Sequence, residues 1–210
     1  MFVSEFRKVG DLKLPPYSGT RVMMLPIVIG DCASIPDFLS HYRWTAWRLA
    51  HMADPEHLGK VGYLTIDEKH VLAGTTHRRA GMHVDGGKDR GWGGGGWAGK
   101  DTGMLTISSH VGCRAWAQTF DGEVGDEGDC EGLFDELQSS GTLLAPGTVY
   151  WLGGLCVHES LAQPSDVKRQ FVRLSLPSEA PWYEGYTENP LGVLPTGQIL
   201  PRRKFMDEGA

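Results

Sequence analysis

The chain has 210 residues, of which 40% are hydrophobic and 22% charged, a composition typical of a single globular domain with a substantial core. This composition excludes a disordered chain, a collagen and a coiled coil. The formal net charge of −6 disfavours a nucleic-acid partner, because a polyanion would need a local basic patch, and the longest one is Arg202-Arg203-Lys204. Glycine is unusually frequent, at 29 residues, and such an excess requires a structural or functional reason.

The cysteines and the apolar segments bound the class further. The 4 cysteines form no CxxC pair, so the sequence indicates neither a zinc knuckle nor a disulfide framework. The first ten residues, MFVSEFRKVG, lack the apolar segment of a signal peptide, and the most apolar run, residues 22–29, is too short to cross a bilayer. We therefore expect a soluble, cytoplasmic protein without a membrane partner.

The first predicted elements are a strand and a helix. Residues 21–29, RVMMLPIVI, predict a buried strand, and Ser34 as N-cap with Pro36 close behind it predicts the start of a helix. The apolar residues of this helix recur at roughly helical spacing: Phe38, Tyr42, Ala46 and Leu49.

The rest of the chain predicts mostly strands. Residues 61–66 and 71–76 are β-rich runs that predict a hairpin across residues 67–70. Further strands are expected at residues 104–109, 114–120, 148–152 and 170–176. Many short strands with one early helix predict a mainly β protein, a sandwich or jelly roll with supporting helices. We expect one domain over residues 1–210, ending in an irregular tail, residues 177–210, wrapped over it.

One pair of residues is suited to metal binding. In Met82-His83-Val84-Asp85-Gly86, an extended backbone places His83 and Asp85 on the same side, where both can bind one metal ion. His158 follows the strand at 148–152 and can supply the third ligand if the sheets face each other. Two histidines and one carboxylate on one side of a metal are the ligands expected for a non-haem Fe(II) oxygenase.

Other interpretations of these residues remain open. His77 and His110 are competing metal ligands, and all these side chains are also compatible with polar loop positions or structural histidines.

A predicted strand further on carries two arginines on one face. Alternation along residues 169–175 places Arg169, Phe171, Arg173 and Ser175 on the same side. An inward-facing arginine is costly unless an anion meets it, and a dicarboxylate co-substrate would do so through charge-assisted hydrogen bonds. The alternative is that both arginines lie on the exposed face of an edge strand.

Three motifs now stand in one order: the HxD motif, a histidine about seventy-five residues later, and an Arg-x-Ser about fifteen residues beyond that. In this pattern the chain resembles the 2-oxoglutarate-dependent Fe(II) dioxygenases of the double-stranded β-helix fold, over about residues 61–176. The resemblance implies that His83, Asp85 and His158 hold Fe(2+) and that Arg173 with Ser175 binds the distal carboxylate of 2-oxoglutarate. Arg169 is the rival for that carboxylate, because the spacing after the distal histidine varies in the family, and it otherwise meets the substrate.

The implied reaction consumes 2-oxoglutarate and O2, releases succinate and CO2, and oxidises a C–H bond of a small molecule or an amino-acid side chain. Asp85 favours hydroxylation over halogenation, because halogenating family members typically have a small residue at that position. The glycine tract at residues 86–99 begins beside the predicted ligands, so we expect a lid whose Trp92 and Trp97 contact substrate. An unstructured loop with incidental tryptophans is the alternative.

Two other classes of protein compete with this interpretation. A cupin-type metalloenzyme would use His83, His158 and His110 without 2-oxoglutarate, although the paired HxH and downstream Glu of cupins are missing. A non-enzymatic jelly-roll binding protein would use the glycine tract and the aromatic tail as interaction surfaces, and it leaves the two aligned arginines unexplained.

Overall fold

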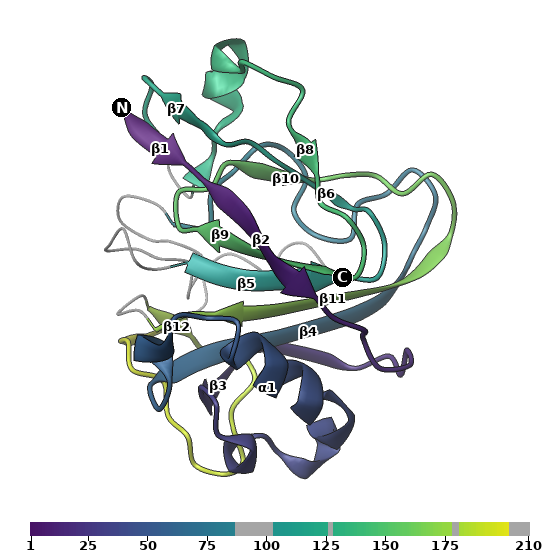
Figure 1. Cartoon of the computed structure of the whole chain (residues 1–210), viewed down its shortest axis with the longest axis vertical. Coiled ribbons are helices and arrows are strands. Elements are labelled where there is room, and N and C mark those ends of the chain that lie inside the picture. Colours follow the sequence, from purple (N-terminus) through teal and green to yellow (C-terminus); the bar gives the residue numbers. More distant parts are fainter. Residues whose placement is uncertain (87–102, 126–127, 178–180, 202–210) are drawn as a thin grey trace.

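The computed structural model describes residues 1–86, 103–125, 128–177 and 181–201. Within these ranges the larger sheet is antiparallel throughout, in the order β2-β9-β5-β11-β4-β3 (Figure 1). Its strands are β2 (Phe6–Asp11), β3 (Arg21–Val28), β4 (Val61–Val71), β5 (Gly103–Ser108), β9 (Thr148–Gly153) and β11 (Val167–Ser175). Trp92, Trp97 and the rest of the glycine tract after Gly86 lie outside the described residues.

A smaller sheet has the order β10-β6-β8, and a short pair, β1-β7, lies beside it (Figure 1). These strands are β1 (Phe2–Ser4), β6 (Cys113–Ala115), β7 (Gln118–Phe120), β8 (Thr142–Leu143) and β10 (His158–Ser160). The chain passes repeatedly from one sheet to the other, from β5 to β6, from β8 to β9 and from β10 to β11. The predicted mainly β, jelly-roll-like core is confirmed, although no pairing among the described strands closes it into a barrel.

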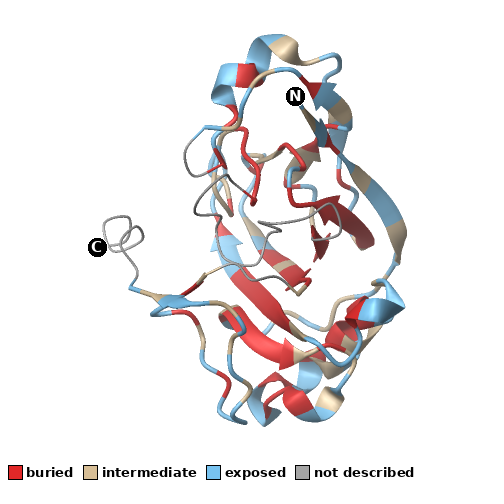
Figure 2. Ribbon diagram, turned by 90° about the vertical axis from the view of Figure 1, so that its left-hand side faces the viewer, coloured by how far each residue is buried: buried red, intermediate tan, exposed pale blue. Residues whose placement is uncertain are grey.

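Side chains on the strands of the larger sheet alternate between two environments. On β11, Val172 and Leu174 enter a core with the helical segment, which contributes Leu39, Tyr42 and Leu49. The residues that alternate with them, such as Phe171 and Arg173, line a cavity on the opposite face. Figure 2 shows buried residues along the strands and loops of the interior, and exposed residues mainly on the outer elements. The period-2 pattern of a strand therefore separates the core from a second, polar interior.

The α-helix begins later than the sequence predicts, because two short 3-10 helices precede it. The elements of this segment are η1 (Cys32–Ser34), η2 (Asp37–Tyr42), α1 (Arg43–Ala50) and, after it, η3 (Pro55–His57). Ser34 is not the N-cap, because its hydroxyl donates to the backbone oxygen of Asp31 and accepts from the amide of Val28. Among the described residues, no helix combines the length and apolarity needed to cross a membrane.

Two strand predictions are wrong in detail. The expected hairpin at residues 67–70 is absent, because β4 runs unbroken through Asp67 and Glu68. Both carboxylates are satisfied within the strand: Asp67 meets arginines, and Glu68 accepts from Tyr42 and Gln170. The strand expected at residues 114–120 is divided into β6 and β7.

The C-terminal segment packs against β3 and β4. It forms a short parallel pair, β12 (Trp182–Tyr183) with β13 (Ile199–Leu200). Trp182 and Tyr186 pack with Met24 and Tyr63, and the indole of Trp182 donates to the backbone oxygen of Met24 at 2.9 Å. The remaining short helix of the described chain is η5 (Glu131–Glu136).

Candidate metal centre

The backbone brings His83 and His158 side by side. The amide of each residue donates to the carbonyl of the other, at 2.9 Å in both directions. Residues paired in this way in an antiparallel ladder direct their side chains to the same face. The two imidazole rings consequently lie 4.4 Å apart, centroid to centroid.

The same ladder directs Asp85 toward the two histidines. Val84, between His83 and Asp85, is fully buried in a separate apolar cluster, so the alternation assigns the two polar side chains to the other face. On its second edge this segment pairs with Gly128, whose carbonyl accepts from the amide of Val84 at 2.8 Å. A Cβ at Gly128 would lie 2.2 Å from the carbonyl oxygen of Val84, so only glycine permits this close approach.

The three predicted ligands form a compact group. One potential ligand atom from each of His83, Asp85 and His158 lies within 4.8 Å of the other two, so the group could hold a metal ion. In each imidazole Nδ1 lies next to a backbone carbonyl, that of Gly81 at 2.8 Å and that of Cys156 at 2.9 Å. A carbonyl can only accept, so Nδ1 carries the proton and Nε2 keeps its lone pair, the usual arrangement of a metal-binding histidine.

The electrostatics of the group favour the ligand forms. Burial and then the charge of His158 lower the pKa of His83 to about 3, so its imidazole is neutral at pH 7. Burial acts to raise the pKa of Asp85, but the positive charge of Arg173, together with those of His158, His83 and Arg78, outweighs burial and holds that pKa well below its usual value. A neutral imidazole and an ionised carboxylate are the states that bind a cation.

The competing histidines lie outside this group. His77 lies 3.3 Å from Asp67, and His110 Nδ1 lies 2.9 Å from the hydroxyl of Ser109. His110 still faces the same cavity, but neither histidine joins the three residues that could hold a metal within the described chain.

A cavity of about 820 Å³ lies between the two sheets. The metal-binding group forms part of its wall, and β4, β5, β9 and β11 of the larger sheet form the opposite part. Arg169 and Arg173, which were expected on the inward face of their strand, both line this cavity. Ser175 does not line the cavity, because its side chain is buried with its hydroxyl 3.9 Å from the sulfur of Met24. A volume of this size accommodates a drug-sized ligand.

The two arginines differ in their partners. Arg173 donates from Nη1 to Asp85 Oδ2 at 2.8 Å and from Nη2 to the sulfur of Met24 at 3.2 Å. Met24 lies in a β-bulge of β3 with a left-handed φ of 52°, which is rare for a residue with a side chain. Arg173 therefore orients a predicted metal ligand, a contact that the sequence does not reveal.

Arg169 is buried without a carboxylate. Arg169 is 1% exposed, and its Nε donates to the hydroxyl of Ser108 at 3.1 Å. Its Nη1 has no hydrogen-bond partner in the described structure. Burial lowers the pKa of Arg169 to about 10, which reflects the cost of a buried charge that pairs with no carboxylate among the described residues. Gly112 leaves room for this side chain, because a Cβ there would lie 2.5 Å from Arg169 Cζ.

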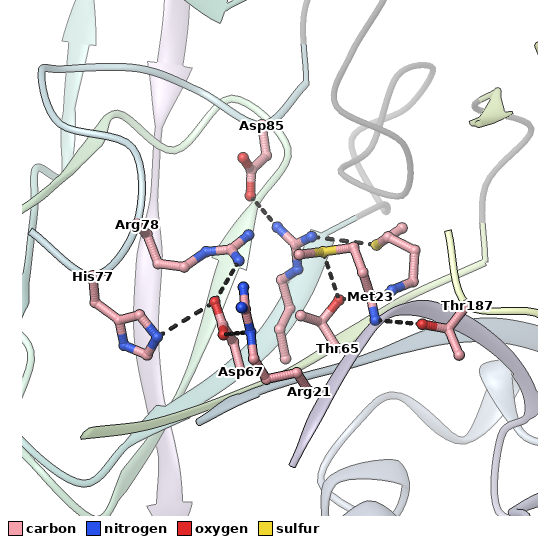
Figure 3. A network of polar contacts seen from close by, with 10 residues as sticks. Arg21, Met23, Thr65, Asp67, His77, Arg78, Asp85 and Thr187 are labelled. Atoms are coloured by element: carbon pink, nitrogen blue, oxygen red, sulfur yellow. Dashed lines mark hydrogen bonds and ion pairs between the residues drawn. The ribbon is translucent and has the colours of Figure 1, made fainter. Parts of the chain in front are cut away.

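The cavity wall carries a second polar group that the sequence does not predict. Asp67 of β4 accepts from Arg21 at 3.1 Å and from Arg78 at 3.0 Å, with His77 close by (Figure 3). The only signal in the sequence was the pair His77-Arg78 after a β-rich run, and an irregular loop offers no periodicity from which to infer its direction.

Comparison of the sequence with models of known protein families and with curated proteins yields no match.

Proposed function

We propose that this protein is an Fe(II)- and 2-oxoglutarate-dependent dioxygenase that hydroxylates a C–H bond of a small molecule or an amino-acid side chain. The observation that carries the proposal is the combination, in one cavity, of a two-histidine, one-carboxylate group with a buried arginine that lacks an anion. Neither a structural histidine pair nor a simple binding surface accounts for both.

The donor set supports Fe(II). Two imidazoles and one carboxylate from one side suit a non-haem iron that keeps its other positions for exogenous ligands. His83 and His158 would bind through Nε2, since each Nδ1 donates to a backbone carbonyl. Arg173 would hold the second oxygen of Asp85, and so fix the carboxylate that binds the metal.

Arg169 supports the presence of a dicarboxylate. Nη1 of Arg169 has no partner in the described structure and needs an anion. The hydroxyl of Ser108, 3.1 Å from Nε of the same arginine, can add a hydrogen bond to that anion. Arg173 already has Asp85 as its anion, so we assign the distal carboxylate of 2-oxoglutarate to Arg169 with Ser108, and not to Arg173 with Ser175. Arg173 then becomes a positioning residue.

When bound, iron and 2-oxoglutarate supply the oxidation: O2 gives one oxygen atom to succinate and one to the hydroxylated carbon, and CO2 is released. The protein residues bind and orient. The apolar and aromatic part of the wall, including Leu152, Tyr150 and Phe171, limits access of water.

The first test is spectroscopic. Anaerobic addition of Fe(II) and 2-oxoglutarate is expected to produce a weak visible charge-transfer band. Arg169→Gln is expected to raise the 2-oxoglutarate concentration that gives half of the maximal band by about 10- to 100-fold. The reason is that a charge-assisted hydrogen bond contributes about 1.5–3 kcal/mol. Arg114→Gln is the matched control, because Arg114 pairs with Glu159 and does not line the cavity.

Two results would contradict the proposal or its details. Absence of any 2-oxoglutarate-dependent band from protein that binds Fe(II) would favour the cupin-type alternative. A loss of 2-oxoglutarate affinity in Arg173→Gln, with Arg169→Gln unchanged, would return the distal carboxylate to Arg173, as the family resemblance implies.

A second variant tests the position of Arg169 without removing its charge. The new methyl group of Gly112→Ala would lie 2.5 Å from Arg169 Cζ, so the guanidinium must move. Because that group is the end of a flexible side chain, we expect little loss of stability but about 10-fold weaker 2-oxoglutarate binding, measured by titration of the same band. Gly132→Ala, where a Cβ meets nothing within 4 Å, is the control. Unchanged affinity in Gly112→Ala would show that the location of the guanidinium is unimportant.

A further inference from the structure

The cavity wall carries an excess of positive charge. Among its described residues it includes Arg21, Lys69, Arg78, Arg169 and Arg173, against the carboxylates of Asp67 and Asp85. The whole chain has a net charge of −6, so the composition does not explain this concentration of cations. Cations gathered in a low-dielectric cavity raise the local concentration of anions there.

The carboxylates do not balance the cations around them. Asp67 is shared by Arg21 and Arg78, with His77 as a third neighbour, and Asp85 is engaged by Arg173. In Figure 3 the side chain of Arg78 extends between Asp67 and Asp85. Burial and then repulsion by the positive charge of Arg173 lower the pKa of Arg78.

The proposed cofactors do not remove this excess. A divalent metal at His83, Asp85 and His158 would add two positive charges beside Arg173, and 2-oxoglutarate would bring two negative charges, one of them to Arg169. Within the described chain, Arg78 would still share the carboxylate of Asp67 with Arg21, although its side chain is 26% exposed and lines the cavity. It also stacks over Phe171, at 5.3 Å from Cζ to the ring centroid, which orients the guanidinium.

We propose that the substrate carries an oxyanion, a carboxylate or a phosphate group, that binds to Arg78 on the side of the cavity where Asp67 and Phe171 hold this arginine in place. That the bound anion is part of the substrate rests on the proposed function, whereas the anion site itself is inferred from the described residues alone. The C–H bond to be oxidised would belong to the part of the molecule that extends from Arg78 toward His83 and Asp85.

The anion site is tested with sulfate as the probe. Sodium sulfate is titrated calorimetrically, at constant ionic strength, into the full chain loaded with Mn(II), with and without saturating 2-oxoglutarate. We expect saturable binding under both conditions, weakened at least about 10-fold in Arg78→Gln and partly restored in Arg78→Lys, because one charge-assisted contact contributes about 1.5–3 kcal/mol. Arg114→Gln should bind sulfate as the unmodified chain does.

Two sulfate results would overturn the inference. Equal binding by the unmodified chain and Arg78→Gln would show that Arg78 holds no anion, provided that the variant keeps its unfolding midpoint. Sulfate binding that disappears at saturating 2-oxoglutarate would assign Arg78 to the co-substrate.

The class of oxyanion and the proposed function are separated by a second measurement. Hexanoate, butyl phosphate and the neutral hexanamide are compared for stimulation of 2-oxoglutarate consumption by the Fe(II) protein. We expect stimulation by one of the acids, which identifies the group, and none by the amide. Stimulation by hexanamide alone would refute an anionic substrate. Absence of all 2-oxoglutarate binding, with Arg78-dependent sulfate binding intact, would refute the dioxygenase and leave the anion site.

Discussion

His158→Ala is expected to abolish tight metal binding. Loss of an outer contact to a metal ligand typically weakens metal affinity about 10- to 100-fold, so loss of a ligand itself should weaken it by more than about 100-fold. The remaining pair, His83 and Asp85, would hold the ion from two positions only. Isothermal titration with Mn(II), together with metal analysis of protein dialysed against Fe(II), measures the effect.

His110→Ala is the matched control for this prediction. His110 lines the same cavity but lies outside the group of possible ligands, with Nδ1 next to the hydroxyl of Ser109. Its variant should therefore bind metal as the unmodified chain does. If His110→Ala also lost the metal, His110 would be a ligand, as the cupin-type alternative requires. If His158→Ala kept its metal affinity, the predicted ligand set would be wrong.

Asp67→Asn is expected to lower the free energy of unfolding by about 2 kcal/mol. Asp67 is buried, and its removal leaves Arg21 and Arg78 without their shared carboxylate. Breaking a fully buried pair costs about 3–5 kcal/mol, and the value here is smaller because both arginines are partly exposed. Urea unfolding at pH 7 measures the difference.

The stabilisation by Asp67 should disappear in acid. Burial acts to raise the pKa of Asp67, but the contacts with His77 and Arg78 outweigh it and hold the pKa well below its usual value. A carboxyl with a depressed pKa in the folded state stabilises above its unfolded pKa of about 4, and this contribution is lost as the pH falls below that value. The difference between the unmodified chain and Asp67→Asn should therefore be largest at neutral pH and shrink from about pH 4 downward.

Asp37→Asn provides the comparison for that pH series. Asp37 also pairs with an arginine, Arg43, but its carboxylate is 98% exposed, so the variant should stay within about 0.5 kcal/mol of the unmodified chain at every pH. An equal effect of the two substitutions would show that burial of Asp67 contributes nothing.

Local periodicity accounts for what could be predicted of the site. Alternation along an extended backbone depends only on neighbouring residues, so it places His83 with Asp85 on one face, and Arg169 with Arg173 on another, whatever the rest of the chain does. The fold class followed from the number and length of the strands and from the scarcity of helices. The turn predicted at Asp67 failed for the opposite reason, since distant arginines stabilise that carboxylate within a strand.

The order of residues along each strand specifies which side chains share a face. This order was enough to predict the three residues that could hold a metal. What each inward arginine meets depends on the tertiary structure: Asp85 for Arg173, and no carboxylate in the described chain for Arg169. Asp85 and Arg173 are 88 residues apart in sequence, and their contact depends on how the two sheets face each other. Periodicity specifies the direction of a side chain, whereas its partner is set by the packing of strands that are distant in sequence.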